Sequence, residues 1–136
     1  MSNKIRLLVF DWDGTLVDSL DRIVASMHHA ANTCGIPQCA DADIHAIIGL
    51  SLEHAFFQLY PDPELADLCE PFRQAYSAHY LTLEQEPSPF YPGVRDALDN
   101  FRTAGYQLAV ATGKSRQGLN RVLSGHGMQN FFDITR

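Results

Sequence analysis

Residues 5–15, IRLLVFDWDGT, decide how the rest of the chain is interpreted. Apolar residues run almost without interruption from Ile5 to Phe10, and a short acidic turn that contains a glycine follows. Such a run is typical of a strand that is buried on both faces of a parallel sheet. Because ligands bind beyond the carboxyl ends of parallel strands, the turn that carries Asp11 and Asp13 is where we expect the chemistry.

The next part of the chain predicts helices alone. Apolar residues at helical spacing predict one helix over 19–35 and three further helical segments within 44–76. Glycine, serine and proline separate these segments at 49–51 and at 61–63. We therefore expect residues 16–85 to form an all-helical unit.

Strand and helix signals alternate again in the last third of the chain. The pattern predicts a helix that ends at Gly105, a strand over 107–111, a helix that begins at Ser115 and the start of a third strand at 131–134. The order of strand, helical insert, helix, strand, helix and strand predicts an α/β fold. In this fold a core of parallel strands carries an inserted α-helical cap.

The predicted domains are a core formed by residues 1–15 and 86–136 and a cap formed by residues 16–85. The core is short for an open parallel sheet, which needs helices on both faces. We therefore expect the sheet to be incomplete. An open strand edge predicts either self-association of the chain or partial mobility near residues 131–136.

Composition narrows the range of functions. The 136 residues carry a net charge of −6 and 46% of them are hydrophobic, which excludes a disordered chain and a pair of full-sized domains. The ten Lys and Arg residues are spread along the chain, which argues against nucleic acid and membrane surfaces as partners. No apolar run is long enough for a membrane span or a secretory signal, so we expect a cytoplasmic protein.

The three cysteines form an odd and sparse set, which fits reduced thiols better than disulfides. A zinc site could be imagined from Cys34 and Cys39 together with His28 and His29. These residues lack the paired spacing of known zinc sites. Reduced thiols without a metal are therefore the expected state.

A second polar turn, Thr112-Gly113-Lys114-Ser115, lies between the second predicted strand and a helix. A hydroxyl group, backbone N–H groups and a helix N-terminus at this point would suit a phosphate group. The turn resembles the end of a P-loop, but Leu108 stands where the first glycine of that motif belongs. An ordinary turn in which Ser115 caps the helix is the alternative, and it does not exclude phosphate contact.

The two aspartates of the first turn repel each other unless a positive charge lies between them. A divalent metal ion with oxygen ligands is the obvious candidate. Gly14 would let the backbone turn sharply and direct N–H groups toward an anion. The alternative is a plain polar turn after a strand. The preceding strand and the second polar turn favour the metal and phosphate interpretation.

These two stretches resemble the motifs of a known family. Residues 11–19, DWDGTLVDS, are similar to the first motif of the haloacid dehalogenase (HAD) superfamily in its phosphatase branch, and residues 108–113, LAVATG, are similar to the second. The helical insert and residues 91–94, YPGV, resemble the phosphoglycolate phosphatase and β-phosphoglucomutase subgroup. The resemblance implies a HAD-type, Rossmann-like core with a helical cap, and a phosphatase that hydrolyses a small phosphomonoester.

The resemblance also implies a role for each residue. Asp11 would attack phosphorus and form an aspartyl-phosphate, and Mg²⁺ bound by Asp11 and the backbone carbonyl of Asp13 would neutralise the phosphate oxygens. Asp13 would serve first as general acid and then as general base. Thr112 and the N–H group of Gly113 would hold the phosphoryl group. Dehalogenases of the superfamily lack the second aspartate, so Asp13 points to phosphate chemistry.

The loop Gly49-Leu50-Ser51 resembles the substrate-specificity loop by which caps of this subgroup select substrates. An ordinary helix-to-helix turn with Ser51 as the N-cap is an equally open alternative. The expected partner is a small phosphorylated metabolite similar to phosphoglycolate.

Two parts of the family pattern cannot be placed before Arg136, namely the third-motif Lys or Arg and the fourth, acidic motif. Lys114 follows the second motif directly and is expected to be a solvated residue at the start of a helix. The resemblance then implies weak metal binding and low turnover. The alternative is a truncated chain that folds, or binds metal or phosphate, without turnover. A phosphomutase is the second enzymatic alternative.

Overall fold

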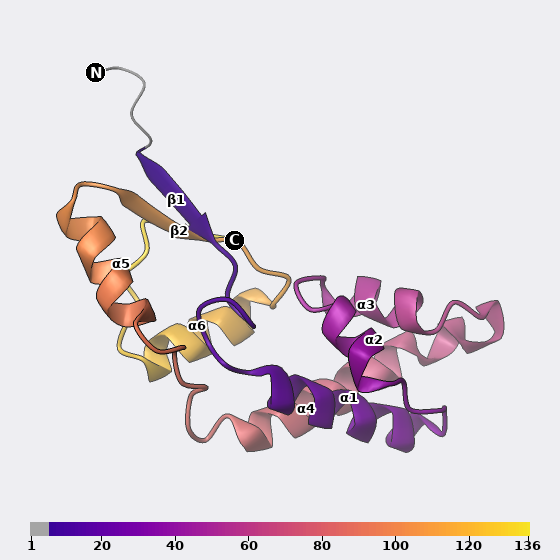
Figure 1. Cartoon of the computed structure of the whole chain (residues 1–136). Helices are drawn as coiled ribbons and strands as arrows, with labels where there is room; N and C mark the ends of the chain where they lie inside the picture. Colours follow the sequence, from indigo (N-terminus) through magenta and orange to yellow (C-terminus); the bar gives the residue numbers. More distant parts are fainter. Residues whose placement is uncertain (1–5) are drawn as a thin grey trace.

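The computed structural model of the protein describes residues 6–136, so Ile5 of the predicted first strand lies outside the described residues. Figure 1 shows two lobes, an α/β core and a group of helices, which the chain connects twice. In chain order the elements are β1 (Leu7–Phe10), α1 (Leu20–Cys34), α2 (Asp41–Ala46), α3 (Leu52–Leu59), the 3₁₀ helix η1 (Pro63–Leu68), α4 (Cys69–Leu83), α5 (Val94–Thr103), β2 (Gln107–Val110), α6 (Arg116–Gly125) and β3 (Ile134–Thr135).

Three parallel strands in the order β1-β2-β3 form the sheet of the core. Val9 lies opposite Ala109, which in turn lies opposite Ile134. Helices α5 and α6 pack against one face of this sheet and share a buried apolar cluster with it. The cluster contains Trp12, Leu16, Val17, Leu98, Leu108, Val110, Leu119, Val122, Leu123, Met128 and Phe132. The predicted α/β fold with parallel strands is confirmed.

The first strand differs from its prediction, because it is not buried on both faces. Leu8 and Phe10 contact the core cluster, whereas 40% of Leu7 and 58% of Val9 are exposed. Ile134, which shares the face of Val9, is 48% exposed. The reason is that α5 and α6 pack against the same face. On the other face the small Ala109 is buried between its neighbours on β1 and β3, whereas the larger side chains remain exposed. We call the exposed surface of Leu7, Val9 and Ile134 the open sheet face.

The third strand is shorter than predicted. It consists of Ile134–Thr135, whereas Phe131 and Phe132 precede it in a turn. The ring of Phe132 packs edge-on against Trp12, with 6.3 Å between the ring centroids. These phenylalanines therefore close the core cluster rather than extend the sheet.

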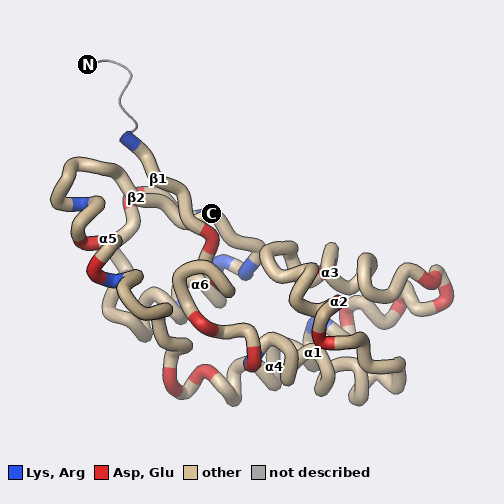
Figure 2. The backbone as a smooth tube through the Cα atoms, viewed as in Figure 1, with Lys and Arg blue, Asp and Glu red and all other residues tan. Residues whose placement is uncertain are grey.

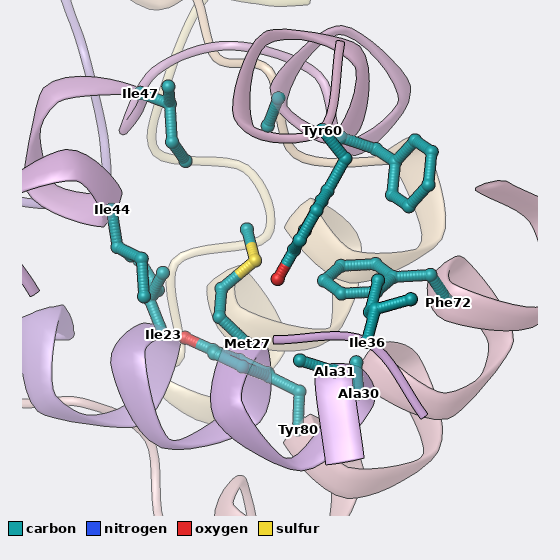
Figure 3. Close-up of a cluster of buried hydrophobic side chains, with 12 residues drawn as sticks. Ile23, Met27, Ala30, Ala31, Ile36, Ile44, Ile47, Tyr60, Phe72 and Tyr80 are labelled. Carbon is teal, nitrogen blue, oxygen red and sulfur yellow. The ribbon is translucent and has the colours of Figure 1, made fainter. Parts of the chain in front are cut away.

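Helices α1 to α4 enclose a second buried cluster. Figure 3 shows Met27, Tyr60 and Phe72 converging at the centre of this cluster, with Ile44 and Tyr80 beside them. Its members are Ile23, Met27, Ala30, Ala31, Ile36, Ile44, Ile47, Ala55, Phe56, Tyr60, Phe72 and Tyr80. We refer to the lobe that holds this cluster as the cap and to the lobe that holds the sheet as the core.

Local sequence signals account for the helix boundaries. Gly35 ends α1 in the left-handed conformation, with φ of +69°, which a residue without a side chain adopts at no steric cost. The hydroxyl groups of Ser51 and Ser115 accept backbone N–H groups and cap α3 and α6, respectively. The predicted break at 49–51 and the predicted helix start at Ser115 are confirmed.

Charged residues are distributed over the whole molecule. Figure 2 shows Lys and Arg on both lobes, interspersed with Asp and Glu. No helix within the described part of the chain has the length and apolarity needed to cross a membrane.

Candidate active site

The acidic turn after β1 is anchored by the side chain between its two aspartates. Trp12 is 1% exposed and packs edge-on against Phe90 and Phe132 in the core cluster. The backbone N–H of Trp12 donates to Asp11 Oδ1 over 2.8 Å, and the backbone carbonyl of Trp12 accepts the N–H of Leu16. Burial of the indole therefore fixes the backbone on which Asp11 stands.

Asp13 is held by a residue at the start of the cap. The hydroxyl group of Ser19 donates to Asp13 Oδ1 over 2.7 Å, and Ser19 is fully buried. Ser19 is also the N-cap residue of α1, but its side chain makes no capping bond there. The hydroxyl that could cap the helix instead orients the carboxylate of Asp13.

Gly14 shapes the turn and does not make the predicted phosphate contact. Its N–H group donates to the carbonyl of Val17 over 3.0 Å, and its φ of +77° allows the chain to reverse direction. Since this N–H is already bonded, it is not available to an anion. The predicted sharp turn is present, and the predicted use of the Gly14 N–H for phosphate has no support.

The second polar turn follows β2 and leads into α6. The Thr112 hydroxyl accepts the N–H of Lys114 over 3.1 Å, and Ser115 caps the helix. The N–H of Gly113 has no hydrogen-bond partner within residues 6–136. The turn therefore offers a free N–H group and a helix N-terminus, both of which favour an anion.

The two turns meet at one cavity between the lobes. The cavity has a volume of about 890 Å³, and both Asp13 and Thr112 line it, as do Gly113 and the cap loop 49–51. Asp11 lies beside this lining: a β-carbon added to Gly49 would stand 3.8 Å from Asp11 Oδ2. Residues about one hundred positions apart in the sequence therefore share a single cleft. Figure 1 shows that the loop before α3 comes close to the chain between β2 and α6.

Lys114 was expected to be solvated, and this expectation is wrong. Its side chain is only 13% exposed, and Nζ lies 3.8 Å from Asp13 Oδ2 and 3.9 Å from Glu84 Oε1. Nζ also lies 4.6 Å from the centre of the Tyr80 ring, within the range of a cation–π interaction. Two acids and an aromatic ring thus draw the ammonium group into the cleft, away from solvent.

Glu84 is a further residue of the cleft, and the sequence did not indicate it. It follows the last turn of α4, and its side chain is 4% exposed. Arg121 Nε lies 2.9 Å from Oε2, while Oε1 has no hydrogen-bond partner. Burial raises the pKa of Glu84, although Lys114 and Arg121 favour the charged form and oppose the shift. Glu84 and the exposed Glu86 lie in the same polar stretch, so the sequence does not show which of them is buried. Only the fold separates them.

The donor set of the first turn fits Mg²⁺. Mg²⁺ prefers oxygen ligands and is commonly held by one or two carboxylates, with water and substrate phosphate completing its shell. Asp11 and the backbone carbonyl of Asp13 offer such oxygens, and Asp11 Oδ2 has only a weak contact, 3.4 Å from the Thr15 hydroxyl. Within residues 6–136 no three His, Cys, Asp or Glu side chains form a group that could hold a metal ion.

Comparison with known proteins decides the family. The sequence profile of the haloacid dehalogenase-like hydrolases matches residues 8–135, which is nearly the whole chain. The chain belongs to the haloacid dehalogenase-like hydrolase family. The resemblance drawn from the two sequence motifs is therefore confirmed.

Named relatives of this haloacid dehalogenase-like hydrolase include phosphatases, and also "Tyrosine-protein kinase PtkA" of Mycobacterium tuberculosis, which is 32% identical over 95% of this chain and 43% of its own length. "Probable phosphatase IndB" of Dickeya dadantii is 35% identical over 94% of this chain and 56% of its own length. A phosphoglycolate phosphatase of Vibrio cholerae is 31% identical over 95% of this chain and 60% of its own length. The crystal structure of a haloacid dehalogenase-like hydrolase from Bacteroides fragilis superposes with a TM-score of 0.82 and 28% identity, over 97% of this chain and 62% of that one. The chain thus spans about two fifths to three fifths of the length of these relatives.

Proposed function

We propose that this chain provides the nucleophile and the phosphate-binding turn of a Mg²⁺-dependent phosphatase that hydrolyses a small phosphomonoester. The observation that carries the proposal is the shared cleft of the two polar turns, one with paired aspartates and one with a free N–H at a helix N-terminus. The names of the phosphatase relatives support the same reaction class.

Asp11 is the proposed nucleophile. One of its carboxylate oxygens attacks phosphorus and forms a bond to it, while the bond between phosphorus and the leaving oxygen breaks. The product is an aspartyl-phosphate and the alcohol of the substrate. The buried Trp12 keeps Asp11 in place, so little conformational entropy is lost as the reactants align.

Asp13 is the proposed general acid and base. In the first step it gives a proton to the leaving oxygen, and in the second it takes a proton from the water that attacks the aspartyl-phosphate. The second step releases inorganic phosphate and restores both carboxyl groups. The Ser19 hydroxyl limits the rotation of the Asp13 side chain, which suits a group that must reach the leaving oxygen.

The second polar turn holds the phosphoryl group. The N–H of Gly113 and the hydroxyl of Thr112 donate to its oxygens, and the nearby ammonium group of Lys114 adds positive charge. Mg²⁺ bound by Asp11 and the backbone carbonyl of Asp13 would supply further positive charge that lets an anionic carboxylate approach the phosphate. Loop 49–51 lies over this turn and is proposed to select the leaving group.

The second candidate function is binding of metal or phosphate without turnover. It requires only the carboxylate of Asp11 and the free N–H group of Gly113, both of which the two turns provide. A phosphomutase would share the first chemical step and differ only in the acceptor of the phosphoryl group. The three free thiols fit the reducing conditions of the cytoplasm, which is the proposed location.

One experiment separates these functions. Release of inorganic phosphate from p-nitrophenyl phosphate and from phosphoglycolate is measured with and without Mg²⁺ for the chain, for Asp11→Asn and for Asp21→Asn, an exposed acid of α1. We expect Mg²⁺-dependent release that Asp11→Asn lowers by about a thousandfold or more and that Asp21→Asn leaves unchanged. Equal activity of the Asp11→Asn variant would remove the proposal. Absence of turnover in every variant would favour the binding function.

A further inference from the structure

The backbone of the cap loop rests directly on the second polar turn. A β-carbon placed on Gly113 would lie 2.7 Å from the carbonyl oxygen of Gly49 and closer still to the carbonyl group of Leu50. Real β-carbons do not approach backbone atoms this closely. The contact between these two loops therefore exists only because residue 113 has no side chain.

Backbone conformation does not explain the glycine at this position. Six glycines of the described chain have positive φ angles, among them Gly49 at +104°, and Gly113 is not one of them. A residue with a side chain at 113 would therefore not meet the strain of a positive φ. What excludes a side chain there is the cap loop above it.

The cap loop is itself well supported, so it would not yield easily to a side chain below it. The N–H of Leu50 donates to the carbonyl of Ile47 over 3.1 Å, and Ser51 caps α3. The same loop reaches the other polar turn, since Gly49 lies beside Asp11. One rigid loop of the cap thus touches both the proposed nucleophile and the phosphate-binding turn.

We propose that Gly113 is a specificity-determining residue, because its missing side chain sets how closely the cap seats on the phosphate-binding turn. With glycine at 113, loop 49–51 lies as close to the phosphate-binding turn as backbone contact permits, which favours small leaving groups at this end of the cleft. A side chain at this position holds loop 49–51 away from the turn and widens the closed cleft. The selectivity for leaving groups rests on the proposed phosphatase function, whereas the contact between the loops does not.

The contact is tested first, on the 136-residue chain and without any substrate. Amide hydrogen exchange of Leu50 and Ser51 is compared between the wild type, Gly113→Ala and the control Gly125→Ala. Gly125 is a suitable control because a β-carbon there would meet only Pro87, at 3.4 Å. We expect exchange at Leu50 and Ser51 to be about tenfold faster in Gly113→Ala and unchanged in Gly125→Ala. Equal exchange in all three proteins would overturn the proposal.

Two further measurements keep the test decisive. Amides of Leu98 and Leu108 report whether the core of Gly113→Ala remains folded. If that variant does not fold, nuclear Overhauser contacts in the wild type decide, and we expect contacts between the α protons of Gly113 and protons of residues 49–51. Their absence would contradict the seated loop.

The selectivity is then measured as the ratio of kcat/KM for acetyl phosphate to kcat/KM for p-nitrophenyl phosphate, which has a much larger leaving group. We expect Gly113→Ala to lower this ratio by about tenfold and Gly125→Ala to leave it unchanged. An unchanged ratio with faster loop exchange would refute the selectivity but keep the loop contact. If loop exchange is faster in Gly113→Ala but the wild type releases no phosphate, the result would count against the proposed function alone.

Discussion

The two lobes bury their apolar residues in different ways. The helices of the cap enclose most of its cluster, whereas the sheet of the core is covered on one face only and leaves Leu7, Val9 and Ile134 exposed. The cleft lies where these lobes meet, and its lining combines charged and polar residues with apolar members of the cap cluster, such as Met27 and Tyr80. The comparison shows that the core packs its apolar cluster apart from the cleft, whereas the cap uses part of its cluster to line it, so the packing of the core and the chemistry of the cleft can be changed separately.

The largest expected effect is in the centre of the cap. Phe56 is fully buried, and its ring lies 5.3 Å from Tyr60 and 5.2 Å from Phe72, measured between centroids. Phe56→Ala should lower the free energy of unfolding by about 3–5 kcal/mol, because it removes a large apolar side chain and leaves a cavity. Urea unfolding followed by circular dichroism measures this loss.

The neighbouring Phe57 gives a matched control, since 43% of it is exposed. Phe57→Ala should cost less than about 1 kcal/mol. Trp12 is the only tryptophan of the chain and lies in the core cluster, so its fluorescence follows the core alone. A shift of the fluorescence transition smaller than that of the dichroism transition would support separable lobes. Equal effects of the two substitutions would contradict the account of the cap.

A smaller effect is expected at the junction of the lobes. Burial raises the folded-state pKa of Glu84, so the folded protein binds this proton more readily than the unfolded chain does. The contribution of Glu84 to stability is therefore present below the unfolded-state pKa and is lost as the pH rises through the folded-state pKa. Glu84→Gln cannot lose a proton, so its stability relative to the wild type should increase as the pH rises from acid to neutral.

Unfolding of the wild type and of Glu84→Gln at several pH values measures this difference. Glu86→Gln serves as the control, because it removes the same charge from an exposed position two residues away. The control should show no such trend. If Glu84→Gln instead loses stability relative to the wild type as the pH rises, Lys114 and Arg121 outweigh the cost of burial.

The smallest effect on stability is expected on the open sheet face. Val9→Lys should change the free energy of unfolding by no more than about 0.5 kcal/mol, because most of the side chain is exposed. The same substitution should reduce self-association through the open sheet face, which exposed apolar side chains favour. Sedimentation velocity of the wild type and of Val9→Lys measures the self-association, and Leu81→Lys on the cap, which also changes an exposed apolar residue, is the control. A monomeric wild type would refute the self-association.

The sequence predicted what is local and missed what depends on distant contacts. Ser51 and Ser115 could be recognised as helix caps because a cap needs only its own turn. The exposure of Val9 could not be predicted, because the same apolar run suits a strand with one covered face and a strand with two. The pattern of a strand contains no information on where the helices beyond it pack.

The candidate site shows the same division. Asp11, Asp13, Thr112 and Gly113 were indicated by their places after two strands, and the structure brings their turns to one cleft. The sequence did not indicate the surroundings of Lys114, because they involve Glu84 and the ring of Tyr80 at the end of α4. The contact of Gly113 with the cap loop was also invisible, because it is a matter of space between two loops that are more than sixty residues apart.

The central claim is that Asp11 and the turn at Thr112 form one phosphate site, and trapping of a phosphate mimic tests it most directly. Beryllium trifluoride binds to an aspartate oxygen as the phosphoryl group would, and fluorine NMR detects the bound fluorides. With Mg²⁺ present, the account predicts bound signals for the wild type, none for Asp11→Asn, and weaker ones for Thr112→Val. Signals of equal strength in the wild type and Asp11→Asn, or no bound signal in the wild type, would contradict it.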